Sequence, residues 1–269
     1  MRSVVGIDAT WTDRELSGVA LVADNGRGWG LAAVAASYSA FIAEHCSDHV
    51  TRHRGSIPNA RALLNTAAQR VGSAIDVVAI DMPLSLAPII GRRVSDNLIS
   101  AQYGAKHAST HTPSATRPGK LSDDLRLAFE REGYSLAVSQ RHPQALLEVY
   151  PHPALIELAT ANRRLPYMLS KIRNYWPNEN PAARRGNPIQ TWTNILGLLD
   201  AEVHGVKEAL TLPLLDAPGW ELKAFEGSLD AVGCAWVGEC VIDGRARAYG
   251  DETSAIWVPE PRPRARFKG

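Results

Sequence analysis

Hydrophobic residues alternate with short polar turns at the start of the chain, and this pattern predicts β-strands. Val4–Thr12 forms one apolar run, and residues 17–24 and 29–37 form two more. The sequence Asp24-Asn25-Gly26 supplies turn residues between the second and third runs. Because the connections are short, we expect these three strands to form an antiparallel meander.

A change of hydrophobic period then predicts a helix followed by a buried strand. Pro58 opens a segment in which Leu63, Leu64, Ala67 and Val71 recur at helical spacing. The next segment, residues 75–83, is apolar at successive positions, which is typical of a strand buried on both faces in a parallel pair. A meander, a helix and a buried strand together predict an α/β fold with a mixed sheet.

The rest of the chain predicts further elements of the same fold. We expect an insertion at about 84–143 with a helix at 122–133, a strand and a helix within 145–158, a long helix at about 188–210, a buried helix at 227–242, and closing strands at 245–249 and 255–258. Residues 1–259 are thus expected to form a single domain, and residues 260–269 a basic tail rich in Pro and Arg.

Composition favours a soluble globular protein. The 269 residues are 45% hydrophobic and 21% charged, and no apolar run approaches the roughly 18 residues of a membrane span. The start of the sequence reads directly as a strand, so we expect no signal peptide, no membrane association and a cytoplasmic location. The three cysteines, Cys46, Cys234 and Cys240, form no CxxC pair, which argues for a reducing compartment and against disulfides or structural zinc.

Charge is balanced overall but uneven along the chain. The net charge of +1 does not favour a dedicated nucleic-acid binder. Basic residues nevertheless gather between Arg163 and Arg185 and again in residues 260–269. Each basic stretch has two interpretations, a solvated loop or a surface that faces phosphate groups.

Four carboxylates interrupt otherwise apolar elements: Asp8, Asp81, Glu148 and Asp230. A buried ionised acid is costly unless it is paired, hydrogen-bonded or bound to a metal. Each acid has a local explanation: the end of a strand for Asp8, a turn for Asp81, an arginine partner from the basic stretch for Glu148, and a first helical turn for Asp230. Because the four acids occur on four different elements, one common explanation is more economical than four separate local ones.

Convergence at one site is that common explanation. If the strand before Asp81 pairs in parallel with the strand of Asp8, their carboxylates stand at adjacent strand ends, where α/β sheets place their sites. The small residues around Asp230 would let its helix approach closely. Oxygen ligands select Mg²⁺ or Mn²⁺ over zinc, so we expect these carboxylates to share a divalent cation of that kind.

Five motifs resemble a known family. The segments "GIDATWT", "IDMPLSL", "EVYPHPALIEL", "LDAVGCAWVG" and "GDETSAIWVP" occur in order along nearly the whole chain. Together they resemble the family of domain of unknown function 429, which is described as predicted nucleases of the RNase H-like fold. The resemblance implies a mixed five-stranded sheet with an insertion after the fourth strand.

The resemblance also implies roles for the acids. In RNase H-like enzymes, acids on the first strand, the fourth strand and a late helix hold two metal ions. These roles fall on Asp8, Asp81 and Asp230, and Glu148 becomes an auxiliary acid. The implied function is a metal-dependent nuclease or phosphodiesterase that acts on nucleic acid or a nucleotide-like substrate.

Two other functions stay open. Actin-like ATP phosphotransferases share this core, but Ala9-Thr10-Trp11 follows Asp8 where such enzymes need a glycine-rich phosphate turn, so this is a minor alternative. The main rival is a binding module that has kept the fold without catalysis. Four basic or proton-transferring side chains are candidates for substrate binding: Arg92, His152, Arg163 and Lys171. Trp11 follows Asp8 closely enough to line a cleft.

Overall fold

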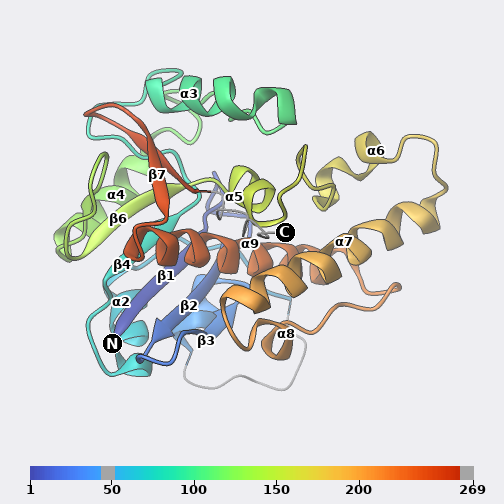
Figure 1. The fold of residues 1–269 in the computed structure, drawn as a ribbon, viewed down its shortest axis with the longest axis horizontal. Coiled ribbons are helices and arrows are strands. Elements are labelled where there is room, and N and C mark those ends of the chain that lie inside the picture. The colour runs from blue at the N-terminus through green and yellow to red at the C-terminus, as the bar shows by residue number, and fades with distance from the viewer. Residues whose placement is uncertain (44–51, 261–269) are drawn as a thin grey trace, which may run out of the picture.

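The computed structural model describes residues 1–43 and 52–260, in which one mixed sheet lies between layers of helices (Figure 1). Its strands are β1 (Arg2–Asp8), β2 (Gly18–Asp24), β3 (Trp29–Ala35), β4 (Val77–Ile80), β5 (Ser135–Leu136), β6 (Ala145–Val149), β7 (Ala246–Gly250) and β8 (Ala255–Pro259). The helices are α1 (Tyr38–Ile42), α2 (Ala60–Val71), α3 (Val94–Tyr103), α4 (Lys120–Arg131), α5 (Pro151–Leu158), α6 (Ile172–Tyr175), α7 (Pro181–Glu202), α8 (Val206–Ala209) and α9 (Gly219–Ile242), with short 3-10 turns η1 (Gly104–Lys106) and η2 (Leu169–Lys171).

The sheet begins as the hydrophobic pattern predicts. Strands β1, β2 and β3 form an antiparallel meander, and β4 pairs in parallel with β1. The strand order is β3-β2-β1-β4-β6-β8-β7, with β5 paired to β6. The prediction of five strands is wrong, because the sheet has eight. The additional strands arise because β8 pairs in parallel with β6 and brings β7 with it, while β5 pairs with the start of β6.

The two faces of the sheet carry separate hydrophobic cores because side chains alternate along each strand. Val4 of β1 packs in the core that contains residues of α5, α7 and α9. Val5 and Ile7 of the same strand pack in the other core, which contains residues of α1, α2 and α4. Helix α9 lies across β1 and β2 on the first face (Figure 1).

Several helix boundaries differ from the prediction. Helix α9 begins at Gly219, eight residues before the predicted 227, because Pro218 stands at its N-cap and the helix stays buried from Leu222 onward. Helix α7 runs over Pro181–Glu202 rather than about 188–210. Its start is set by Asn180, whose side chain accepts a hydrogen bond from Ala183 N, with Pro181 in the first turn.

The insertion predicted at about 84–143 contains α3, η1, α4 and β5. Within the described ranges, no helix has both the length and the apolar character needed to cross a membrane. Cys234 and Cys240 are buried free thiols in α9. Cys46 and the Pro/Arg tail from residue 261 onward lie outside the described residues.

Candidate functional site

The alternation of side chains along β1 places Asp8 under α9. Val4, Gly6 and Asp8 share one face of the strand, and Gly6 stands against the helix backbone. A Cβ atom on Gly6 would lie 2.3 Å from the carbonyl oxygen of Ala231, and one on Gly227 would lie 3.4 Å from Oδ2 of Asp8. The absence of a side chain at Gly6 therefore lets α9 come close enough to cover the acid.

Asp81 lies beside Asp8 at the carboxyl end of the neighbouring strand. Ile7 pairs with Ile80 in the parallel register, and the Asp81 amide donates a hydrogen bond of 2.9 Å to the carbonyl oxygen of Ile7. Val77 and Ala79 pack in the same core as α9, so the alternation of β4 continues onto that face at Asp81. The two aspartates thus end adjacent strands on the face that α9 covers.

Asp230 joins these aspartates from the middle of α9. It is buried, and its Oδ1 atom accepts a hydrogen bond of 2.6 Å from the hydroxyl of Tyr167. Because α9 begins at Gly219, Asp230 is far from the first helical turn, and the explanation by the helix dipole does not apply.

Glu148 faces the other side of the sheet. Leu147 and Val149 pack in the core under α9, so the residue between them alternates away from it. Arg93 binds both carboxylate oxygens, with Nη1–Oε2 at 2.6 Å and Nη2–Oε1 at 2.7 Å. The Leu84 amide adds a third hydrogen bond of 2.7 Å. Glu148 therefore has an arginine partner, but this partner comes from the segment before α3 and not from the basic stretch at 162–187.

The three aspartates, of which Asp230 is buried and Asp8 and Asp81 are half-buried, have pKa values above the ordinary range because they are desolvated and their charges repel one another. Burial, followed by the charge of Glu226 and opposed by that of Lys223, raises the pKa of Asp8 to about 6. Burial, and then the charges of Asp8 and Asp230, raise the pKa of Asp81 well above its usual value. Burial and Asp8 act in the same direction on Asp230. The site therefore holds more negative charge than its own cations balance.

Two basic side chains partly offset this charge. Lys223 lies about two turns before Asp230 on α9 and contacts Glu226 at 2.5 Å, and its charge lowers the pKa of Asp8 and of Asp230. The charge of Arg164 lowers the pKa of Asp81. Arg164 could not be singled out from the sequence, since Arg163 and Arg164 are the same residue type in one basic stretch and nothing in that stretch distinguishes them.

A hydrogen-bond chain continues from Asp230 through Tyr167 to His152. The Tyr167 hydroxyl donates to Asp230, and its oxygen lies 3.3 Å from Nδ1 of His152. Donation by Tyr167 leaves its oxygen as the acceptor, so Nδ1 of His152 carries the proton. Burial, followed by the charges of Arg164 and His111, lowers the pKa of His152 well below its usual value, which keeps the imidazole neutral.

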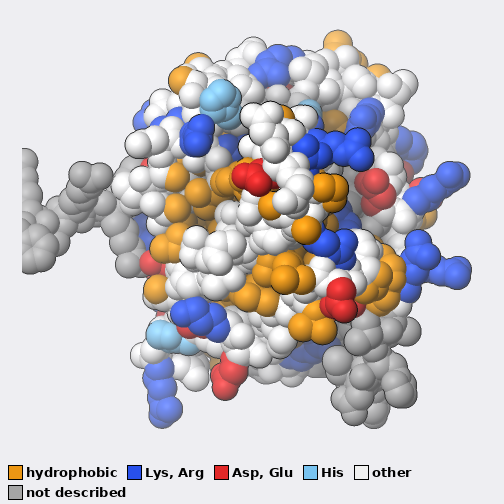
Figure 2. Space-filling model, turned by 90° about the vertical axis from the view of Figure 1, so that its right-hand side faces the viewer, with side chains coloured by type: hydrophobic (Ala, Val, Ile, Leu, Met, Phe, Trp, Pro, Cys, Tyr) orange, Lys and Arg blue, Asp and Glu red, His pale blue; other side chains and the backbone are white. Residues whose placement is uncertain are grey.

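The other three predicted substrate-binding residues differ in their exposure and in the residues they act on. Lys171 is half-buried in η2 and close enough to lower the pKa of His111. Arg163 is exposed. Arg92 is exposed and donates to Thr112 Oγ1 at 3.2 Å, so it holds the segment that carries His111. Figure 2 views the side where α6 and α7 protrude, and there Lys and Arg side chains stand around the edge of the face with hydrophobic side chains between them.

The chemistry of the acids suits a hard cation, although they do not form a closed coordination shell. In residues 1–43 and 52–260, no group of three or more His, Cys, Asp or Glu side chains is arranged to hold a metal ion. Mg²⁺ commonly keeps several waters and binds through one or two carboxylates together with substrate phosphates. The adjacent, charge-crowded pair Asp8 and Asp81 provides such a donor set.

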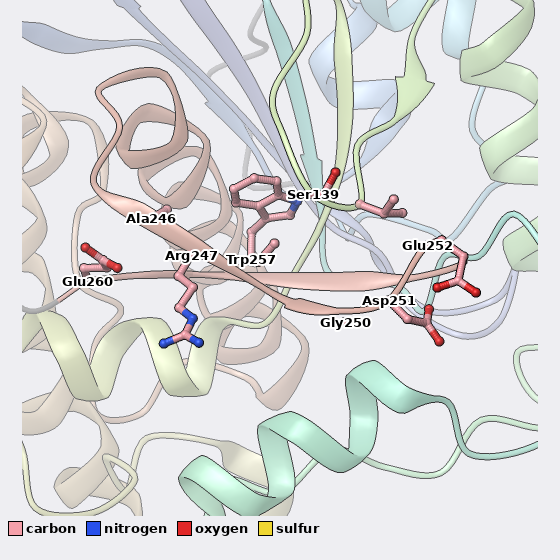
Figure 3. A pocket seen from close by; sticks show the side chains of 10 residues that line it. Ser139, Ala246, Arg247, Gly250, Asp251, Glu252, Trp257 and Glu260 are labelled. Carbon is pink, nitrogen blue, oxygen red and sulfur yellow. The ribbon is translucent and has the colours of Figure 1, made fainter.

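A groove in the described part of the chain lies elsewhere. It encloses about 560 Å³ beside β7, and its lining includes Arg247, Asp251, Glu252 and Glu260 (Figure 3). None of the four predicted catalytic acids lines it. The candidate site is therefore the group of side chains at the ends of β1 and β4 and not this groove.

Comparison with known proteins identifies a family and no activity. The family model described as "Protein of unknown function (DUF429)" matches residues 6–254. This match confirms the family that the five sequence motifs predicted. No curated protein and no solved structure matches the chain.

Proposed function

The chain belongs to the DUF429 family, whose description assigns no activity, and we propose that it is a divalent-metal-dependent phosphodiester hydrolase. Its substrate would be nucleic acid or a nucleotide-like molecule. One observation carries this proposal: buried Asp230 and half-buried Asp8 and Asp81, from three different elements, come together with raised pKa values. Such a cluster is stabilised by a bound cation, and functional sites are where charges of one sign are gathered at this cost.

We include an RNase H-like topology in the proposal. The order β3-β2-β1-β4-β6, with an antiparallel meander followed by parallel strands, supports it. The acids on β1, after β4 and on α9 occupy the positions that the family resemblance implies. The β5 strand and the β7–β8 hairpin would then be additions to this core.

Mg²⁺ or Mn²⁺, with two ions proposed, would be held by Asp8, Asp81 and Asp230. The ions would supply an activated water and charge stabilisation for the leaving oxygen. Glu148 keeps the auxiliary place that the resemblance implies. Its bonds to Arg93 and to the Leu84 amide fix the backbone that follows Asp81, so in this structure it acts on the site by positioning.

The remaining side chains of the site have roles that follow from their contacts. Tyr167 fixes one oxygen of Asp230 and leaves the other available to a ligand. Neutral His152 fixes Tyr167 in turn. The charge of Arg164 acts on Asp81, and its guanidinium would bind the phosphate group of the substrate, which the acids alone would repel.

The second candidate function is a binding module on the same fold. It is favoured by the bonds that already occupy oxygens of Asp230 and Glu148, because a site kept for structure needs no free ligand atoms. The two candidates differ in their response to Mn²⁺ and in turnover, and one experiment separates them.

The experiment is a cleavage assay on labelled single-stranded DNA, duplex DNA, RNA and hybrid substrates with Mn²⁺. We expect cleavage by the wild type and none by Asp8→Asn or Asp230→Asn, since asparagine keeps the shape of the side chain but loses the charge that holds a hard cation. Asp124→Asn is the matched control, because Asp124 is exposed on α4 and pairs with Lys120. Absence of cleavage by the wild type on every substrate would favour the binding module. Equal cleavage by wild type and both site variants would locate the activity elsewhere.

A further inference from the structure

Three segments far apart in the sequence meet beside the aspartates and form a cluster of rings and cations. The rings of Trp11 and His111 lie 6.3 Å apart at 79°, an edge-on arrangement. The guanidinium of Arg117 lies over the Trp11 ring, 5.7 Å from its centre. The first residue follows β1, and the other two belong to the segment between α3 and α4. We call Trp11, His111 and Arg117 the aromatic rim.

Cations from a third segment face the same histidine. Burial, followed by the charges of Lys171, Arg164 and Arg117, lowers the pKa of His111. His111 is therefore neutral at pH 7 and presents an uncharged ring among positive groups. The hydrogen bond from Arg92 to Thr112 ties the chain next to His111 to α3 and so positions the rim.

The aromatic rim adjoins the acidic site. Trp11 is three residues from Asp8, so their Cα atoms lie at most about 11 Å apart. Arg164 lowers the pKa of Asp81 and also that of His111, so its charge acts on the acids and on the rim together. Its guanidinium is held by a contact of 2.5 Å from Nη2 to the sulfur of Met168.

We propose that the aromatic rim binds an unpaired nucleobase while Arg164 and Lys171 bind the adjoining phosphate, so that the site takes single-stranded nucleic acid. This inference rests on the proposed function and specifies its substrate class. Arg117 is exposed, and its flat guanidinium, held against Trp11, offers an outer face on which a base stacks. In a duplex the bases are already stacked and paired, so a rim of this kind selects single strands.

The test measures binding without cleavage, by fluorescence anisotropy of labelled oligonucleotides in EDTA. The ligands are a single-stranded oligonucleotide, the same sequence as a duplex, an abasic strand of equal length, and a free mononucleotide. We expect the wild type to bind the single strand at least about tenfold tighter than the duplex, the abasic strand or the mononucleotide, as loss of one stacking contact would give. Equal or tighter binding of the duplex would overturn the inference, and equal binding of the mononucleotide would assign the rim to a small nucleotide instead.

Variants separate stacking from charge. Trp11→Ala and Arg117→Ala should each weaken single-strand binding about tenfold. Trp11→Ala should leave binding of the abasic strand nearly unchanged, whereas Arg164→Ala should weaken binding of both strands. Trp11→Phe should retain most of the affinity, which distinguishes stacking from a folding defect. Arg247→Ala is the matched control, because Arg247 lies over the Tyr249 ring at 5.3 Å on β7, away from the acids. An equal loss in Arg247→Ala and Arg117→Ala would count against the rim.

The outcome is independent of turnover. A preference for single strands in EDTA together with no cleavage in Mn²⁺ would support base binding by the aromatic rim and contradict the proposed hydrolase activity. Cleavage together with duplex preference would do the reverse.

Discussion

Gly18 on β2 lies directly against Gly227 on α9. A Cβ atom on Gly18 would stand 2.1 Å from the carbonyl oxygen of Gly227, closer than any side chain tolerates. Gly227 is also the residue of α9 that approaches Oδ2 of Asp8. This contact therefore sets how closely the helix that carries Asp230 approaches the strand end that carries Asp8.

Gly18→Ala should disturb fold and site together. The added methyl group must push α9 outward, and overpacking of this kind costs about 1–3 kcal/mol of unfolding free energy. Gly233→Ala, in α9, is the control, since no neighbouring atom outside the helix's own backbone lies within 4 Å of the added Cβ, and a helix-interior Gly→Ala change gains about 0.5–1 kcal/mol. Chemical denaturation of both variants measures the difference, and equal stabilities would contradict the close contact.

Asp8→Asn should stabilise the metal-free protein in a pH-dependent way. The pKa of Asp8 is raised to about 6, so the folded protein binds more protons than the unfolded chain between the ordinary carboxyl pKa and this value. Stability from this group therefore falls as pH rises through that window, and above pH 6 the full penalty remains. Removing it should gain on the order of 2–3 kcal/mol at pH 7.5 in EDTA and little below pH 4. A gain that is the same at both pH values would contradict the raised pKa.

Divalent cations should stabilise the wild type. At about 100 times its dissociation constant, a cation bound to the folded state alone adds about 2.7 kcal/mol. Thermal unfolding with Mg²⁺, Mn²⁺ or EDTA should show a rise in Tm that Asp8→Asn reduces and Asp124→Asn preserves. Equal rises in Asp8→Asn and in the wild type would exclude Asp8 as a ligand, and removal of the ions by EDTA should reverse the rise in the wild type.

Arg93→Met should destabilise the fold strongly. Arg93 is nearly buried and pairs with both Glu148 and Asp96, so its loss leaves two buried carboxylates without a counter-ion. Breaking a buried pair from one side costs about 3–5 kcal/mol. Adding Glu148→Gln to this variant should recover part of the loss, because it removes one of the unpaired charges. Urea denaturation measures both effects, and Arg61→Met, at an exposed position where the arginine pairs with Glu132, should change stability by no more than about 1 kcal/mol.

Arg164→Ala and Arg163→Ala should differ in their effect on ligand binding. Arg164 acts on Asp81 and His111, whereas Arg163 is exposed. We expect Arg164→Ala to weaken oligonucleotide binding and reduce its salt dependence by about one unit in slope, and Arg163→Ala to have a smaller effect. Salt titrations in EDTA measure both slopes. A larger effect from Arg163 would place the phosphate contact on the outer surface.

The local sequence pattern determined the elements of the core. Alternating apolar runs predicted the meander, the doubly apolar run 75–83 predicted a parallel partner for β1, and acids within apolar segments indicated where a site would form. These features can be predicted from the sequence because they depend on neighbours along the chain, which share one strand or one helix turn. The resemblance put the number of strands too low, and whether the β7–β8 hairpin joins the sheet depends on its contact with β6.

Only the tertiary structure decided which acids meet. Asp8 and Asp81 fall on the face that α9 covers, while Glu148, one step out of phase in β6, falls on the other face and meets Arg93, 55 residues away in the chain. The sequence shows how side chains alternate within each strand, but it does not show the register between strands, which decides which side chains share a face. The sequence likewise does not predict which of Arg163 and Arg164 points toward the interior. Register and inward orientation come from packing between distant segments, and such packing leaves no local period in the sequence.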